Sequence, residues 1–77
     1  MTAKEIFEKL GYKAQYDDKY INWIKKVDGI TCEITFDFNT ELVEFYFYGK
    51  DFKDRYDVDL NISELQAINK QVEELRW

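Results

Sequence analysis

Three carboxylates are the residues of this 77-residue chain whose spacing could support chemistry. The hairpins predicted below place Glu44 diagonal to both Glu33 and Asp37. Diagonal neighbours in a sheet lie about 7 to 8 Å apart, which overlaps the separation of the two carboxylates in inverting glycosidases. Those pairs flank a substrate cleft, which one face of a small sheet is not expected to form. Solvent-facing acids, or acids that take part in binding, are therefore favoured over catalytic ones.

The residue types that the sequence lacks exclude most familiar catalytic and metal-binding chemistry. It has no His, the commonest general base and zinc ligand, and its one Cys cannot form a CxxC motif. It also lacks the motifs GxxxxGK(S/T), GxGxxG, HExxH and GxSxG. Cys32 alternates with Ile34 and Phe36, so we expect a buried structural thiol and not a nucleophile. We expect no enzyme and no cofactor.

A run of four Asp residues between Asp51 and Asp59 could suggest a divalent cation site. A calcium-binding EF-hand loop, however, carries oxygen ligands at alternate positions and a glycine at the sixth. In this run, Lys and Arg residues stand between the Asp residues instead. A solvated or edge-protecting segment is therefore favoured, and no metal site is expected.

The composition indicates one folded domain, residues 1–77. Six Phe, six Tyr and two Trp supply enough apolar surface for a core without disulfides. The net charge of −5 disfavours direct binding of nucleic acid, because affinity for phosphate comes from Lys and Arg. No apolar stretch approaches the roughly 18 residues of a membrane span. The single Cys and the lack of a leader-like start predict a cytoplasmic location and no membrane partner.

A helix is predicted near each end of the sequence. Thr2 and Glu5 have the form of a capping box, and apolar residues then recur at helical spacing until Gly11, which predicts a first helix of about nine residues. Ser63 and Gln66 have the same form and predict the start of a second helix that runs nearly to the end.

The second predicted helix has one apolar side. Ile62 is placed to pack against Ala67 across the start of the helix. The apolar stripe that should face the core consists of Leu65, Ile68, Val72 and Leu75.

Two hairpins are predicted between the helices. Asp28-Gly29 tolerates the positive φ angles of a tight turn, so residue numbers of paired positions in the first hairpin should sum to 57. Asn39-Thr40 marks the second turn, where they should sum to 79. Both registers place the same apolar residues on one face, as expected of a real sheet: Ile21, Trp23, Cys32, Ile34, Phe36, Phe38, Val43, Phe45 and Phe47.

Together these elements predict a two-layer α+β fold in the order α-β-β-β-(β)-α, with an antiparallel sheet of three to four strands and both helices on one face. Residues 12–16 could add a short edge strand. Residues 52–60 are predicted as a fourth strand or an extended arm.

The opposite face of the sheet should carry more large side chains than solubility requires, namely Tyr20, Ile24, Leu42, Tyr46 and Tyr48. Tyrosine is favoured at protein interfaces for its rigid bulk and single polar group. We therefore predict a protein-binding face, unless residues of the 50s or a second copy of the chain cover it. Its expected contact residues are Tyr20, Glu33, Asp37, Glu44, Tyr46 and Tyr48.

The opening sequence MTAKEIFEKLGY and the closing sequence ISELQAINKQVEELRW resemble a group of small uncharacterised proteins encoded by phages and prophages of low-GC Gram-positive bacteria, the Firmicutes. Members of that group usually have Gly where this chain has Arg76. The resemblance implies a phage-type protein that acts inside a bacterial cell. It supplies no catalytic residues.

Two functional classes follow from these observations. The first is a small accessory protein that binds a host or phage protein through the acidic, tyrosine-rich face. A narrower form is an inhibitor of a host defence nuclease, anti-CRISPR-like or imitating nucleic-acid charge, whose binding should weaken steeply with salt. The second class is a structural or assembly module that forms a homodimer through the same face.

Overall fold

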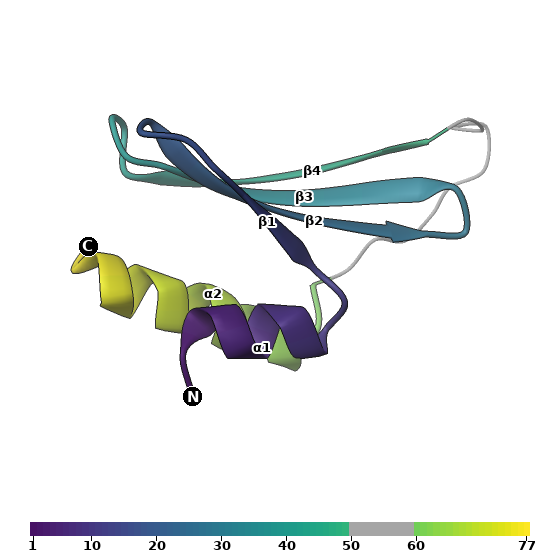
Figure 1. Cartoon of the computed structure of the whole chain (residues 1–77), viewed down its shortest axis with the longest axis horizontal. Coiled ribbons are helices and arrows are strands. Elements are labelled where there is room, and N and C mark those ends of the chain that lie inside the picture. The colour runs from purple at the N-terminus through teal and green to yellow at the C-terminus, as the bar shows by residue number, and fades with distance from the viewer. Residues whose placement is uncertain (50–59) are drawn as a thin grey trace.

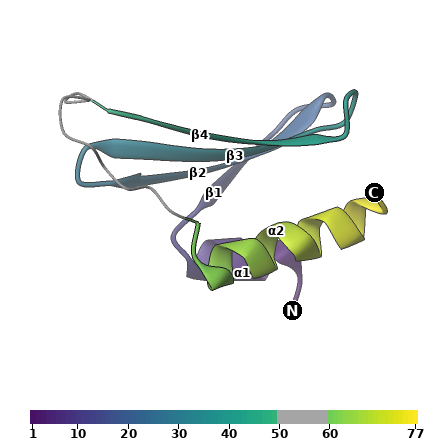
Figure 2. The same cartoon turned by 180° about the vertical axis from the view of Figure 1, so that it is seen from behind.

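The computed structural model describes residues 1–49 and 60–77 of the chain. Its elements form an antiparallel sheet in the order β1-β2-β3-β4, with both helices on one side of it (Figure 1). The view from behind shows the same two layers (Figure 2). The elements are α1 (Ala3–Lys9), β1 (Lys13–Tyr16), β2 (Tyr20–Val27), β3 (Ile30–Asp37), β4 (Leu42–Gly49) and α2 (Ile62–Leu75).

This architecture confirms the predicted α+β fold, and the possible edge strand at residues 12–16 is β1. The predicted strand or arm at residues 52–60 falls almost entirely outside the described residues. Since β1 pairs with β2, the described sheet reaches four strands without it.

Both predicted hairpin registers are confirmed. In the first, Tyr20 pairs with Asp37 and Val27 with Ile30, so the numbers sum to 57. In the second, Asp37 pairs with Leu42, giving 79. One placement differs, because Phe38 lies in the loop after β3 and not in the sheet.

The backbone angles of the turn between β2 and β3 explain why Asp and Gly occupy it. Asp28 has φ 50° and Gly29 has φ 79°, as a two-residue turn that follows the twist of the strands requires. A Cβ atom at Gly49, at the end of β4, would lie 2.7 Å from the carbonyl oxygen of Gly29. The close approach of β4 to this turn therefore requires glycine at position 49.

Helix α1 begins with the predicted capping box. The Thr2 hydroxyl accepts the amide of Glu5 at 3.2 Å, and the Glu5 carboxylate accepts the amide of Thr2 at 3.0 Å. Gly11, with φ 95°, follows the helix and turns the chain towards β1. The regular helix has seven residues, slightly fewer than predicted.

The predicted start of α2 at Ser63 and Gln66 is wrong, because Asn61 caps the helix. The Asn61 side chain accepts the amide of Glu64 at 2.8 Å, and the Glu64 carboxylate accepts the amide of Asn61 at 3.1 Å. Asn is as good an N-cap as Ser, and Glu64 supplies the acidic partner of a capping box. Ile62 is 73% exposed and does not anchor the start of the helix.

The core-facing side of α2 is also rotated from the predicted stripe. Leu65 is exposed, whereas Glu64, Ala67 and Gln71 are buried. The other three predicted residues, Ile68, Val72 and Leu75, do pack against the core. The rotation follows from two buried polar contacts of α2 with the rest of the protein.

These contacts are made by Glu64 and Gln71. The Tyr12 hydroxyl donates to the Glu64 carboxylate, and the Trp23 indole Nε1–H donates to Gln71 at 3.1 Å. Burial, together with the contact with Glu64, raises the pKa of Tyr12 far above its usual range. Among the described residues, no buried side-chain nitrogen or oxygen lacks a hydrogen-bond partner. Specific polar contacts thus set which side of α2 faces the sheet.

Phe7 of α1 is the centre of the apolar core between the helices and the sheet. Its ring stacks on Trp23 with centroids 4.6 Å apart and meets the edges of Tyr12 and Phe36. Rings in such arrangements add about 0.5 to 1.5 kcal/mol per pair beyond the burial of their surface. The fully buried residues of this core also include Ala3, Ile34 and Ala67.

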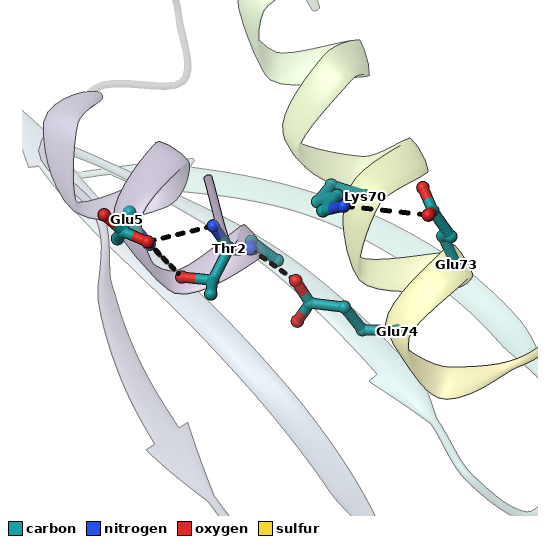
Figure 3. A network of polar contacts seen from close by, with 6 residues as sticks. Thr2, Glu5, Lys70, Glu73 and Glu74 are labelled. Atoms are coloured by element: carbon teal, nitrogen blue, oxygen red, sulfur yellow. Dashed lines mark hydrogen bonds and ion pairs between the residues drawn. The ribbon is translucent and has the colours of Figure 1, made fainter.

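The two helices are joined at their ends by a hydrogen bond. The Glu74 carboxylate accepts the backbone amide of Ala3 at 2.8 Å (Figure 3). An amide in the first turn of a helix has no partner within that helix, and Glu74 provides one from α2. Nearby, Lys70 and Glu73 form a surface ion pair at 3.6 Å within α2 (Figure 3).

Candidate functional site

The outer face of the sheet, turned away from α1 and α2, is the candidate site. Successive side chains of a strand alternate between the two faces, and Trp23 fixes the inner one by its contacts with both helices. Neither α1 nor α2 lies on the outer side (Figures 1 and 2). The outer face consists of Lys13, Gln15, Tyr20, Asn22, Ile24, Lys26, Thr31, Glu33, Thr35, Asp37, Leu42, Glu44, Tyr46 and Tyr48.

All six residues predicted for binding lie on this face. Tyr20 is paired with Asp37 near one end of the strands, and Glu33 is paired with Tyr46 in the middle. Glu44 lies opposite Thr35, as the register predicted. The structure thus brings the predicted residues onto one surface, but it spreads them over three strands.

A hydrogen-bond network centred on Asn22 holds the middle of the outer face. Asn22 donates to the Glu33 carboxylate at 2.7 Å and accepts the Thr35 hydroxyl at 2.9 Å. The Tyr48 hydroxyl also donates to Glu33, and these bonds lower the pKa of the Glu33 carboxyl below its usual value. Although Asn22 lies on the open side of the sheet, it is buried by its neighbours.

The two tyrosines of β4 are half exposed, and their hydroxyls are hydrogen-bonded to carboxylates. The Tyr46 hydroxyl donates to the Glu44 carboxylate, and this contact raises the pKa of Tyr46. Its bond to Glu33 likewise raises the pKa of Tyr48. Both phenols therefore stay protonated at neutral pH and act as hydrogen-bond donors. The ring surfaces remain available for contact, with Tyr46 51% and Tyr48 49% exposed.

One part of the outer face is hollowed, over a volume of about 740 Å³. Ile24 provides apolar surface, while Lys13 and Lys26 supply two amino groups. An amide, two hydroxyls and the Glu33 carboxylate, which already accepts bonds from Asn22 and Tyr48, complete the polar lining. The two amino groups beside Ile24 suit an occupant with both apolar and acidic groups. The lining residues are Gly11, Lys13, Ala14, Gln15, Ile24, Lys26, Thr31, Glu33 and Tyr48.

The charge of the outer face differs from the prediction of an acidic surface. Lys13 and Lys26 stand on β1 and β2, towards the Asp28-Gly29 turn. Asp37 and Glu44 stand on β3 and β4, towards the loop of residues 38–41. The face is thus divided diagonally into a basic corner and an acidic corner.

The sequence reading missed the lysines and Asn22. The first-hairpin register already implied that Asn22 and Lys26 share the face of Tyr20 and Ile24, because these residues alternate along one strand. Lys13 could not be placed in the same way, since no turn type fixed the register of β1. Its position follows from the pairing of Lys13 with Ile24.

The described residues offer no support for metal or thiol chemistry. Within 1–49 and 60–77, no three residues of the types His, Cys, Asp and Glu are grouped to hold a metal ion. Cys32 is buried on the inner face, as predicted, and burial raises the pKa of its thiol. A thiol with a raised pKa is a poor nucleophile.

No helix in the described part of the chain has both the length and the apolar character needed to span a membrane. Comparison of the chain with known proteins points to no family. Neither a protein-family model, nor a curated protein, nor a solved structure matches it. Functional assignment therefore depends on the outer face itself.

Proposed function

We propose that this chain is a small phage-type accessory protein that works by binding another protein in the bacterial cytoplasm. Its contact surface is the outer face of the sheet. The observation that carries the proposal is the state of Tyr46 and Tyr48, whose hydroxyls are held by Glu44 and Glu33 while half of each side chain is exposed. The phage and bacterial context comes from the resemblance of the two end sequences.

Ordered, exposed aromatic rings favour binding for an energetic reason. A protein interface loses about 0.5 to 1.5 kcal/mol for each side chain that must be immobilised on association. Tyr46 and Tyr48 each have an internal partner for the hydroxyl, so part of this cost is met during folding. Leu42, 56% exposed on the same strand, adds apolar surface beside them.

The mixed charge of the outer face favours a general protein-binding role over the role of a nuclease inhibitor. A surface that imitates nucleic acid needs a row of acids to replace phosphates. Here Lys13 and Lys26 share the face with the acids. A partner with both basic and acidic groups fits this pattern better than a uniformly basic channel.

The proposal is tested by affinity capture from a lysate of a low-GC Gram-positive bacterium, using the tagged chain and an outer-face variant, Glu44→Lys with Tyr46→Ala. The matched control, Glu8→Lys with Leu65→Ala, makes the same kinds of change on the exposed helix surface. We expect the parent and the control to retain a common protein, and the outer-face variant to lose it.

Circular dichroism should first show that all three proteins are folded. Retention of the same proteins by the outer-face variant would overturn the assignment of the binding surface. Loss of the captured protein from the helix-surface control alone would move the interface to the helices. Repeating the capture at high salt distinguishes the nuclease inhibitor, since binding by charge imitation should be lost there.

A further inference from the structure

The basic and acidic corners of the outer face lie diagonally across the sheet from each other. The basic corner, Lys13 and Lys26, borders the hollow that contains Ile24. The acidic corner contains Asp37 and Glu44, with the exposed side chain of Leu42 beside them. One corner thus offers amino groups around apolar surface, and the other offers carboxylates around an apolar side chain.

We propose that, when no other partner is bound, the outer face packs against a second copy of this chain, face to face in a two-fold symmetric dimer. A half-turn about the other diagonal of the sheet places the basic corner of each copy over the acidic corner of its mate. Leu42 of each copy then meets the hollow of the other. Because the contact is isologous, both charge contacts form twice. The proposal goes beyond the proposed function, since it adds self-association to the same binding face.

The expected packing is one that sheets commonly adopt. A half-turn about a diagonal makes the strands of the two copies cross at a large angle, as in orthogonal sheet packing. The middle of the face can be buried against its copy without leaving the Glu33 carboxylate unpaired, because Glu33 already accepts hydrogen bonds from Asn22 and Tyr48. Complementary potentials of this kind fix orientation and exclude other arrangements.

The size of the face predicts a weak dimer. Three strands of eight residues and one of four, at about 3.3 Å per residue and about 4.8 Å between strands, span roughly 440 Å² of flat area. Stable interfaces bury about 800 Å² of accessible surface on each partner. We therefore expect a reversible equilibrium in the micromolar range, visible only as concentration rises.

Charge exchange between the corners provides the test. One variant, Lys13→Glu with Lys26→Glu, makes the basic corner acidic. The other, Asp37→Asn with Glu44→Lys, makes the acidic corner basic; an Asn side-chain oxygen can still accept the loop amides of Asn39 and Thr40 that Asp37 accepts. Sedimentation velocity at low salt is measured for the parent, for each variant and for their equimolar mixture, up to several hundred micromolar.

We expect the parent to dimerise, each variant alone to associate at least about tenfold more weakly, and the mixture to recover association. In the mixed dimer both corner contacts join opposite charges again. From the parent's −5, the first variant carries net charge −9 and the second −2. Overall attraction between two negative proteins cannot produce the recovery, so it must come from the corners.

A second measurement uses the unaltered protein. A zero-length carbodiimide cross-linker, applied to a mixture of isotope-labelled and unlabelled chains, should join Lys13 or Lys26 of one copy to the acidic corner of another. Within one chain, Lys13 and Glu44 lie three strand spacings apart, about 14 Å, which is too far for a direct amide.

Three results would overturn the dimer: a parent that stays monomeric throughout the concentration range, a mixture no more associated than its components, or cross-links confined to single chains. The proposed function would survive a monomeric parent if the lysate capture still depended on Glu44 and Tyr46. Loss of that dependence together with a charge-exchanged dimer would leave self-association as the role of the face.

Discussion

The two faces of the sheet arise from the same alternating strands but differ in how their side chains are used. On the inner face, Trp23 and Phe36 are buried among aromatic rings from α1 and the chain end. On the outer face, hydrogen bonds hold Asn22, Glu33 and Tyr48 in place without an overlying layer in the described structure. Packing against helices maintains the fold, whereas the polar network orders a surface that remains open for contact.

The largest expected effect comes from removing an inner-face ring. Trp23→Ala deletes the stacking with Phe7 and the hydrogen bond to Gln71, and should cost about 3 to 5 kcal/mol of stability. In a domain of this size that loss approaches the whole free energy of unfolding. Urea unfolding followed by circular dichroism measures it. On the outer face, Tyr46→Ala should change stability by less than about 1 kcal/mol, and equal losses would contradict the division between the faces.

The same group, a tyrosine hydroxyl, can be removed from the core and from the outer face. Tyr12→Phe leaves one oxygen of buried Glu64 without its donor and should cost about 1 to 3 kcal/mol. Tyr46→Phe removes an equivalent hydroxyl from half-buried Glu44, in a bond exposed to solvent where water replaces it, and should cost about 0.5 kcal/mol or less. Thermal unfolding of the two variants gives the comparison directly. A larger loss for Tyr46→Phe would show that the outer network supports the fold as well.

The helix layer can be strengthened without altering either face of the sheet. Arg76 ends α2 in the left-handed region, with φ 59°, and the Trp77 amide bonds to the carbonyl of Val72. Glycine adopts this conformation without steric cost, so Arg76→Gly should stabilise the fold by about 1 kcal/mol. Differential scanning calorimetry should show a higher melting temperature, with self-association unchanged. A lower melting temperature would mean that the Arg76 side chain has a contact worth more than the backbone relief.

The smallest expected effect is on the stability of the fold at acidic pH. Because hydrogen bonds from Tyr48 and Asn22 lower the pKa of folded Glu33 below its ordinary 4.5, the unfolded chain binds more protons between these two values. The contribution of Glu33 is therefore complete above about pH 5 and declines as pH falls through the lowered pKa. Glu33→Gln should flatten this part of the curve of stability against pH. A curve unchanged in slope would show that the network gives Glu33 no preference for its charged form.

Much of the sheet was predictable because two short turns fix every pairing that follows from them. Asp28-Gly29 and the loop at Asn39-Thr40 determine the faces of β2, β3 and β4, so the outer positions of Glu33, Glu44 and Tyr46 could be derived from the sequence. Which side of α2 faces the core was less predictable. Periodicity selected Leu65, but the buried bonds of Glu64 and Gln71 to residues far away along the chain determine the rotation.

The charge pattern of the outer face could not be derived for a related reason. β1 follows a helix and a glycine, and no turn of known geometry sets its register before the structure is known. Lys13 is therefore placed only by its pairing with Ile24. Summing charges along the sequence treats the face as acidic, whereas the pairing of strands separates the two signs onto opposite corners.

The bond between Glu74 and Ala3 also orders events during synthesis. Its two residues are 71 positions apart, whereas the hairpins join positions that leave the ribosome almost together. Local contacts form early in folding and distant ones late. The strands can therefore associate on the nascent chain, and Phe7 of α1 can stack on Trp23, before α2 emerges to accept the Ala3 amide. Until then the part of the inner face that α2 covers is exposed, and transiently exposed apolar surface of this kind favours aggregation.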